Sequence, residues 1–417
     1  MKRNRQIGKS IIGIANSALG RIIVLTGARQ VGKTTLVQNV ATKYKHLSIE
    51  DPVGRLAYTS LSATQWEQLY PQAVLDEVQK EPQLIESIKA TYDAFDHVRY
   101  ILTGSSQLLL LQKVKESLAG RSRIIELYPL VLPEIVAYGW GSEIRFSEWQ
   151  QLVLNPSTAP SFLPSLLIDP LYGEKEKAWR HLITFGGYPA VVDEKLSDEE
   201  RWQWLRSYVQ TYLERDIRDL VSFRDLEPFV KLQHAVAAQT AQTYSLSTLG
   251  RDTGASGKTV QRYLQYLSIS YQTIILPAWD RNPNKRIAKA AKIHFLDYGV
   301  LQAVLQKRGG MTEAEFESLI VSEIYKQTKN TLADAKFHHL RTQDGREIDL
   351  LVEFPQGYYA FEIKMSSNIH PTDARHLRNL SEFLDKPLLH SFVVSNDPQT
   401  KSLGDGTTAV NATLFLG

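Results

Sequence analysis

The segment from Gly27 to Thr35 has the residue types and the spacing that bind the phosphates of a nucleotide. It reads Gly-Ala-Arg-Gln-Val-Gly-Lys-Thr-Thr and matches the pattern G-x-x-x-x-G-K-[ST]. The glycines let backbone N–H groups close around phosphate, Lys33 can neutralise its charge, and the Thr34 hydroxyl can ligate Mg²⁺. We therefore predict contacts to the nucleotide along the whole loop: Gly27, Ala28, Arg29, Gln30, Val31, Gly32, Lys33, Thr34 and Thr35.

The flanking residues predict the elements that must position this loop. The β-branched run from Arg21 to Thr26 is typical of a buried strand, and Leu36 to Val40 continues as a helix. A strand before the loop and a helix after it are the context that the motif requires. The amino end of the helix also favours a bound anion.

Two further apolar strands are predicted to end near the same phosphates. The run from Ala73 to Leu75 ends in Asp76 and Glu77. There an Asp can hold Mg²⁺ through water and a Glu can polarise an attacking water, although acidic pairs also end ordinary strands. The strand from Arg99 to Thr103 leads to Ser105, which is either a sensor of the phosphate or a helix cap.

A later arginine is a candidate for contacting the γ-phosphate. Arg121 follows the third strand and could act as an arginine finger, in the same chain or in a neighbouring one; the alternative is an exposed basic loop. Arg215 is a second candidate, but its spacing from Asp and Glu on a predicted helix favours surface ion pairs.

From Arg21 to about Glu134, the order of these motifs resembles an AAA+-type P-loop ATPase. The resemblance implies a parallel sheet with flanking helices, ATP and Mg²⁺ as ligands, and hydrolysis in which Lys33 and Glu77 are catalytic. The absence of an Asn-Lys-x-Asp motif, which reads guanine, agrees with ATP rather than GTP.

In the middle of the chain we predict a linker, a helical lid and then a helix-turn-helix segment. Pro156 to Pro170 is a Pro- and Ser-rich linker, and Glu199 to Leu220 is a helix whose aromatic stripe we assign to the core of a helical lid. The stretch from Ser245 to Leu267 has helix-turn-helix spacing, and a basic hairpin follows it. The basic residues of that hairpin are Arg281, Lys285, Arg286, Lys289 and Lys292.

Helix-turn-helix plus hairpin resembles a winged-helix domain, which implies duplex DNA as a partner. The residues facing a groove would be Lys258, Thr259, Gln261 and Arg262, with the hairpin on phosphates. A winged helix that binds protein is the alternative.

The C-terminal part carries carboxylates and a lysine at spacings that suit a metal-dependent site. A helix after Met311 contains Glu317 and Glu323. Alternation places Ile348, Leu350 and Val352 on one face of a strand and Asp349 on the other. The next strand brings Glu362 and Lys364, and two carboxylates with a lysine can hold Mg²⁺ and stabilise an attacking water.

This arrangement resembles the PD-(D/E)xK nuclease core. The resemblance implies that Asp349 and Glu362 are metal ligands, with Glu317 or else Glu323 from the helix, and that Lys364 is catalytic. Whether the site cuts DNA or only binds a ligand stays open. The adjacent histidines 338 and 339 would point to opposite faces of a strand, so we assign them structural roles.

Composition bounds these assignments. The chain has 417 residues, a net charge of +3, no cysteine and no long apolar run, which excludes disulfides, zinc ribbons and a membrane-spanning helix. We predict an α/β protein, cytoplasmic, with four parts: an ATPase domain (1–140), linker and lid (141–226), winged helix (227–308) and nuclease-like domain (309–417).

Nearly the whole chain resembles a prokaryotic family of AAA+-type ATPases that carry a C-terminal restriction-endonuclease-like domain of unknown function. The leading hypothesis is an ATP-hydrolysing protein that acts on DNA. The rival is an ATP-dependent assembly switch whose C-terminal domain is a non-catalytic binding module. A homo-oligomer is compatible with both.

Overall fold

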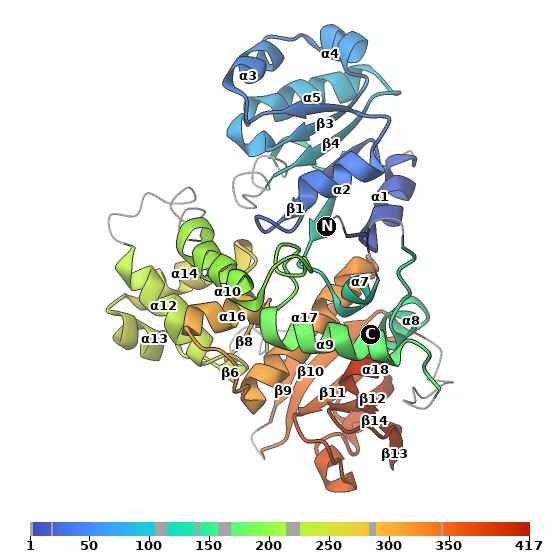
Figure 1. The fold of residues 1–417 in the computed structure, drawn as a ribbon, viewed down its shortest axis with the longest axis vertical. Helices are drawn as coiled ribbons and strands as arrows, with labels where there is room; N and C mark the ends of the chain where they lie inside the picture. The colour runs from blue at the N-terminus through green and yellow to red at the C-terminus, as the bar shows by residue number, and fades with distance from the viewer. Residues whose placement is uncertain are drawn as a thin grey trace.

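The computed structural model describes residues 3–17, 20–104, 114, 116–137, 139, 142–156, 168–213, 226–282, 289–342 and 345–417. A parallel five-stranded sheet, in the order β2-β3-β4-β1-β5, forms the blue and teal end of the molecule in Figure 1. Its strands are β1 (Ile22–Gly27), β2 (Lys45–Ser48), β3 (Gln72–Asp76), β4 (Arg99–Thr103) and β5 (Ser122–Leu127). The helices around it are α1 (Ile7–Ala15), α2 (Lys33–Val40), α3 (Pro52–Thr59), α4 (Ala63–Leu69) and α5 (Gln83–Ala94), with a short 3-10 helix at Val78–Lys80. After β5, the short helix α7 (Leu132–Val136) packs against α9 (Tyr172–Phe185). The expected parallel sheet is thus present.

Helices of the middle segment lie between this sheet and the C-terminal sheet (Figure 1). They are α8 (Glu148–Leu154), α9 (Tyr172–Phe185), α10 (Asp198–Ser207) and the π-helix η3 (Tyr208–Leu213). Trp202, Leu205 and Tyr208 of the aromatic stripe are buried, which confirms that the stripe belongs to the core.

The next segment combines four described helices with a small antiparallel sheet. In chain order it contains α12 (Glu227–Ala238), β6 (Gln242–Thr243), α13 (Leu246–Thr253), α14 (Gly257–Ile269), β7 (Thr273–Leu276), β8 (Lys292–Phe295) and α16 (Tyr298–Leu305). Strand β8 lies between β6 and β7. Gly254 ends α13 in the left-handed conformation, and the Ser256 side chain caps α14, so the turn between the two helices is locally encoded.

A mixed six-stranded sheet forms the C-terminal part, in the order β13-β14-β12-β11-β10-β9. Its elements are α17 (Glu313–Asn330), β9 (Lys336–Arg341), β10 (Glu347–Phe354), β11 (Gly357–Lys364), 3-10 turns at Pro371–Ala374 and Leu380–Glu382, β12 (Leu388–Ser395), β13 (Lys401–Gly404), β14 (Thr407–Asn411) and α18 (Ala412–Leu416).

The predicted faces of β10 are wrong at one residue. The pairing of β10 with β9 shifts between Ile348 and Leu351. Because this bulge interrupts the alternation, Ile348 packs with Leu351 in one core, whereas Leu350 and Val352 pack in the other.

One hydrophobic core runs through the whole molecule. Buried residues from Ile7 near the amino end to Leu416 near the carboxyl end belong to the same cluster. Within this cluster Trp149 of α8 packs edge-on against Phe361 of β11. The outer face of each large sheet has a smaller core of its own. The parts of the chain therefore fold against one another.

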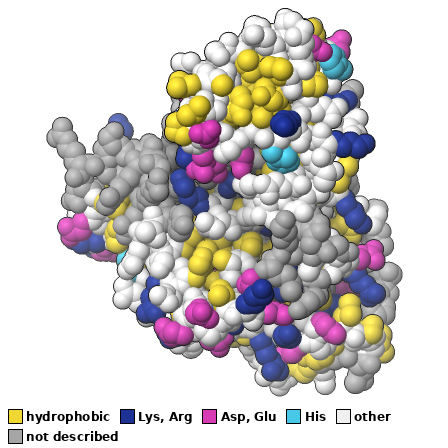
Figure 2. Space-filling model, turned by 45° about the horizontal axis from the view of Figure 1, so that its top comes forward, with side chains coloured by type: hydrophobic (Ala, Val, Ile, Leu, Met, Phe, Trp, Pro, Cys, Tyr) yellow, Lys and Arg dark blue, Asp and Glu magenta, His cyan; other side chains and the backbone are white. Residues whose placement is uncertain are grey.

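Two surface observations complete the description. Val53 and Leu56 of α3 are exposed, at the end of the molecule where Figure 2 shows hydrophobic side chains gathered. Within the described ranges, no helix is both long and apolar enough to cross a bilayer.

Candidate nucleotide site and a second acidic site

In the loop between β1 and α2, the Lys33 side chain is buried and hydrogen-bonded to carbonyl groups of the loop itself. Lys33 is 6% exposed, and its ammonium group donates to the carbonyl oxygens of Gly27 (2.9 Å) and Ala28 (2.8 Å). Gly32 has φ +93°, a left-handed value that favours glycine. A Cβ on Gly27 would lie 2.3 Å from the Leu127 carbonyl oxygen, so the backbone approach there requires glycine.

Three elements bring oxygen atoms together beside the lysine. Thr34 at the start of α2 donates its hydroxyl to Asp76 Oδ2 (2.8 Å). Thr103 at the end of β4 donates to the other carboxylate oxygen of Asp76. Hydroxyl and carboxylate oxygens are the ligands Mg²⁺ prefers, so the donor set fits a magnesium nucleotide. Sequence reasoning missed Thr103, although a polar residue at a strand end was the available signal; Ser105, which we predicted there, lies outside the described residues.

Glu77 directly follows β3 in a strained conformation. Its φ is +61°, a value that residues other than glycine rarely adopt. Its carboxylate is half-buried and accepts a hydrogen bond from the Gln79 side chain. Glu77 therefore lies at the same sheet edge as Asp76, next to the loop.

The structure corrects the placement of Arg121. This residue precedes β5, whose first residue Ser122 pairs with Ile22 at the beginning of β1, whereas the loop follows the end of β1. The five steps of β1 between them span about 17 Å. Arg121 instead binds both carboxylate oxygens of Asp93 (2.8 and 3.2 Å). It therefore does not reach the phosphate site of its own chain, and a role in a neighbouring chain stays a prediction. Arg215 lies outside the described residues.

Two residues that the sequence did not assign to the nucleotide site contact the loop from other elements. The buried Arg5 guanidinium, just before α1, donates to the Val31 carbonyl (2.8 Å) and forms an ion pair with the buried Glu134 of α7 (3.2 Å). Tyr208 of η3 donates to the Arg29 carbonyl (3.3 Å). The segment predicted to form a lid thus contacts the loop through Tyr208.

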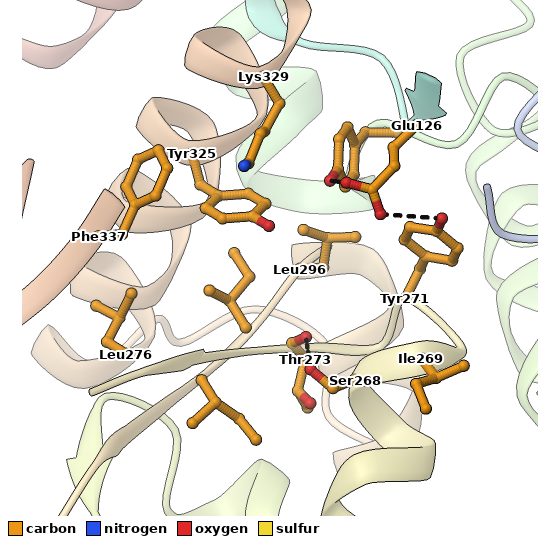
Figure 3. A pocket seen from close by; sticks show the side chains of 13 residues that line it. Glu126, Ser268, Ile269, Tyr271, Thr273, Leu276, Leu296, Tyr325, Lys329 and Phe337 are labelled. Atoms are coloured by element: carbon orange, nitrogen blue, oxygen red, sulfur yellow. Dashed lines mark hydrogen bonds between the residues drawn. The ribbon is translucent and has the colours of Figure 1, made fainter. Parts of the chain in front are cut away.

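Behind the loop lies a polar junction with the helix-turn-helix segment (Figure 3). The Tyr271 hydroxyl, between α14 and β7, is 2.9 Å from the Thr26 hydroxyl of β1 and donates to Glu126 of β5 (3.2 Å). Tyr128 donates to the second Glu126 oxygen (2.8 Å). Burial raises the pKa of Tyr128 and Tyr271, so both stay protonated donors. A pocket of about 360 Å³, which Lys329 also lines, adjoins them.

The predicted metal-site residues come together in the C-terminal part, with an unexpected lysine among them. The ammonium group of Lys292 (β8) lies 3.0 Å from Glu317 of α17, and 2.9 and 3.5 Å from Glu347 and Asp349 of β10. Burial raises the pKa of Glu317 to about 8, with Asp349 adding to the shift. Within the described part of the chain, no group of three His, Asp or Glu is arranged to hold a metal ion, and at this site the Lys292 ammonium group lies among the acids.

Strand β11 supplies the rest of this acidic site. Lys364 donates to Glu362 Oε1 (2.8 Å), and the Ile363 N–H donates to Asp349 (2.8 Å). Burial raises the pKa of Glu362 to about 8, again with help from Asp349. The alternative helix glutamate, Glu323, accepts from the Leu132 backbone instead (3.0 Å) and is not part of the site.

The basic hairpin differs from its prediction. Lys292 is buried, Lys289 pairs with Asp280 (2.7 Å), and Arg281 donates to backbone carbonyls of residues 382 and 384. Lys285 and Arg286 lie outside the described residues. On α14, by contrast, the groove-facing set is accessible: Lys258, Gln261 and Arg262 are exposed, and Thr259 is half-exposed. The two histidines of β9 take separate partners, Glu353 for His338 and the Ala290 carbonyl for His339.

Family models match three stretches of the chain. Residues 19–136 match the model described as an AAA domain. Residues 176–310 and 313–415 match two domains of unknown function, DUF8612 and DUF4143. Uncharacterized protein Rv2008c of Mycobacterium tuberculosis is 27% identical over 95% of this chain and 81% of its own length. Uncharacterized protein MJ1544 of Methanocaldococcus jannaschii is 22% identical over 61% of this chain and 56% of its own.

Among solved structures, the Walker-type ATPase PABY2304 of Pyrococcus abyssi aligns over 73% of this chain and 96% of its own, at 16% identity and a TM-score of 0.43. PCH-2 of C. elegans aligns over 62% and 68%, at 12% identity and a TM-score of 0.22. The AAA match coincides with the parallel sheet and the phosphate loop described above. Residues 19–136 of this chain are therefore an AAA domain of the P-loop ATPase type.

Proposed function

We propose that the protein binds ATP with Mg²⁺ at the loop after β1 and hydrolyses it. The observation that carries the proposal is that the hydroxyl groups of Thr34 and Thr103 both donate to the Asp76 carboxylate, while Lys33, which precedes Thr34, is held by carbonyl groups of the loop. Bound Mg²⁺ would neutralise phosphate charge there. Lys33 and the loop N–H groups orient the phosphates, Thr34 and Asp76 hold the cation, and Glu77 orients the attacking water and accepts its proton.

Steady-state ATP hydrolysis tests this assignment. Glu77→Gln should lower kcat at least about 100-fold while ATP binding persists, since it removes the base and keeps the shape. Lys33→Ala should weaken binding as well as turnover. Lys80→Ala is the matched control, because Lys80 lies close by and pairs with Glu50 at the surface. Turnover in both variants equal to that of the native protein would contradict the proposal.

We further propose that duplex DNA is the partner of the helix-turn-helix segment. The order α12, β6, α13, α14, β7, β8 with β8 central supports a winged helix. Lys258 and Arg262 of α14 are exposed, and neither forms an ion pair within the part of the chain that the structure describes. Two free cations on the exposed face of this helix favour phosphate contacts.

Fluorescence anisotropy with a labelled duplex at several salt concentrations measures the affinity for DNA and its dependence on salt. Lys258→Ala/Arg262→Ala should weaken binding and lower the slope of log K against log salt by about 2, one for each lost phosphate contact. Lys231→Ala, whose lysine is paired with Glu227 on α12, should change neither quantity.

The rival function, an ATP-dependent assembly switch, also has support. Arg281, Lys289 and Lys292 of the hairpin are engaged within the chain, so the wing offers DNA fewer cations than its sequence implies. A protein with no salt-dependent duplex affinity whose oligomeric state changes with ATP, measured by light scattering, would favour the switch. Arg121 would then be a candidate contact with a neighbouring chain.

Nuclease activity is a second candidate for the C-terminal part. The grouping of Glu317, Asp349, Glu362 and Lys364 supports it. Cleavage of duplex DNA with Mg²⁺ or Mn²⁺ that disappears in Lys364→Ala would establish it, and Lys33→Ala would show whether ATP controls the cleavage.

A further inference from the structure

The acidic site gathers several carboxyl groups around a buried lysine. Lys292 is 3% exposed, and three carboxylates, Glu317, Glu347 and Asp349, lie within 3.5 Å of its ammonium group. Glu362 and Lys364 adjoin them. These carboxyl groups offer more oxygen atoms than one ammonium group can bind, and carboxylate oxygens are the ligands that a divalent cation takes in proteins.

A second observation points to a missing ligand. Glu362 is 5% exposed; its Oε1 accepts from Lys364, but its Oε2 is buried and has no hydrogen-bond partner within the described residues. A buried oxygen atom without a partner costs about 1–3 kcal/mol, more when it is charged. A bound cation would satisfy it.

The lysine and the acids belong to different parts of the fold. Lys292 is the first residue of β8, in the small sheet of the helix-turn-helix segment, whereas the acids lie on α17, β10 and β11. Strand β8 packs on α17. Lys292 is also the last basic residue of the hairpin predicted to contact DNA, and a displacement of the first residues of β8 would move the lysine.

We propose that the Lys292 ammonium group is a built-in substitute for a divalent cation, and that the acidic site binds such a cation only when β8 shifts and withdraws the lysine. The helix-turn-helix segment, through Lys292, thus prevents cation binding at the C-terminal site until β8 shifts; we call this arrangement the latch. The inference rests on the nuclease-like candidate only in sharing its carboxylates, because it concerns cation binding and requires no cleavage.

Mn²⁺ binding to the full chain tests the latch. Free Mn²⁺ is measured by electron paramagnetic resonance, without nucleotide or DNA, and every protein carries Asp76→Asn so that the loop site does not contribute. Lys292→Met should bind Mn²⁺ at least tenfold more tightly than the Lys292 protein, and adding Glu362→Gln should remove the gain. Lys307→Met is the control, because Lys307 pairs with Glu315 at the start of the same helix and lies outside the site.

Equal Mn²⁺ affinity with and without Lys292, or a gain that survives Glu362→Gln, would overturn the proposal. A second measurement uses the native lysine, in case Lys292→Met does not fold. Reductive methylation read by mass spectrometry should label Lys292 slowly, and any Mn²⁺ bound through Glu362 should accelerate that labelling several-fold. Mn²⁺ bound through Glu362 with Lys292 still protected would refute the latch. A Lys292→Met protein that binds Mn²⁺ but cuts no DNA would contradict the nuclease candidate alone.

Discussion

Asp76 accepts hydrogen bonds from two threonine hydroxyl groups, and only Thr34 belongs to the phosphate-binding motif. Thr103→Val should lower kcat for ATP about tenfold, because one carboxylate oxygen loses a donor worth about 1–1.5 kcal/mol. Thr103→Ser keeps the hydroxyl and should retain most of the activity. Steady-state kinetics of both variants measure the difference. Similar losses in the two would assign the role of Thr103 to packing rather than to hydrogen bonding.

His181 on α9 makes stability depend on pH. Burial, with Arg201 and Arg3 nearby, lowers its pKa to about 4, so the unfolded chain binds a proton more readily, with a pKa of about 6.5. The stabilisation is therefore complete above pH 6.5 and is lost as pH falls towards 4. At pH 5 the loss is about 2 kcal/mol from this residue. Urea unfolding measures the free energy of unfolding at pH 7 and pH 5. The loss between the two pH values should be about 2 kcal/mol smaller in His181→Phe than in the native protein. An equal loss in both proteins would contradict the assignment.

Single residues were predictable where the motif itself carries the chemistry. The loop around Lys33, and the grouping of Asp349, Glu362 and Lys364, follow from type and spacing. Lys292 was read as a surface cation of the hairpin because the sequence shows a charge but not the acids that bury it. Thr103 and Arg5 were missed for the same reason, since their roles depend on partners far along the chain.

Among the elements, the turn between α9 and α10 fixes the distance between three segments. Gly187 donates to Asp297 before α16 (2.7 Å), its carbonyl accepts from Leu130 N (2.7 Å), and a Cβ there would lie 2.2 Å from the Leu130 carbonyl oxygen. Gly187→Ala should therefore cost at least about 2 kcal/mol of unfolding free energy. Gly173→Ala in α9, where a Cβ meets no atom within 4 Å, should instead be neutral or stabilising. Thermal unfolding of the pair measures this contrast, and equal destabilisation would contradict it.

Element types were more predictable than their faces and ends. Apolar runs followed by polar residues indicated β1, β3 and β4, and the capping serine and glycine marked the turn before α14. Periodicity could not reveal the bulge in β10, because it arises from pairing with β9. Nor could it show that Arg121 directly precedes β5, a strand parallel to β1, which places Arg121 beside the beginning of β1 and not beside the loop at its end.

At the scale of the whole molecule, the division at residues 140, 226 and 308 stays a prediction, yet one core crosses all three positions. Composition indicates where segments begin and end, but shared burial depends on tertiary contacts that no local pattern contains. A continuous core means that a shift in one part is felt by side chains in the others.

The junction behind the phosphate loop is where such coupling is testable. Tyr271, at the end of the helix that would meet DNA, touches Thr26 of the strand that ends in the loop. Tyr271→Phe removes that hydroxyl and keeps the ring. We expect ATP turnover without DNA to stay within about twofold, because Tyr271 contacts neither Lys33 nor Asp76, and any acceleration by duplex DNA to fall at least about fivefold, a coupling of about 1 kcal/mol.

The ratio of kcat with and without duplex measures this coupling, and Tyr244→Phe, elsewhere in the same segment, is the control. If Tyr271→Phe kept the full response to DNA, the hydrogen bond between Thr26 and Tyr271 would be structural only. Coupling would then have to travel through packing between the segments, because the polar contact from Tyr208 to Arg29 comes from η3 and not from the helix-turn-helix segment. Loss of basal turnover instead would place Tyr271 in support of the loop itself.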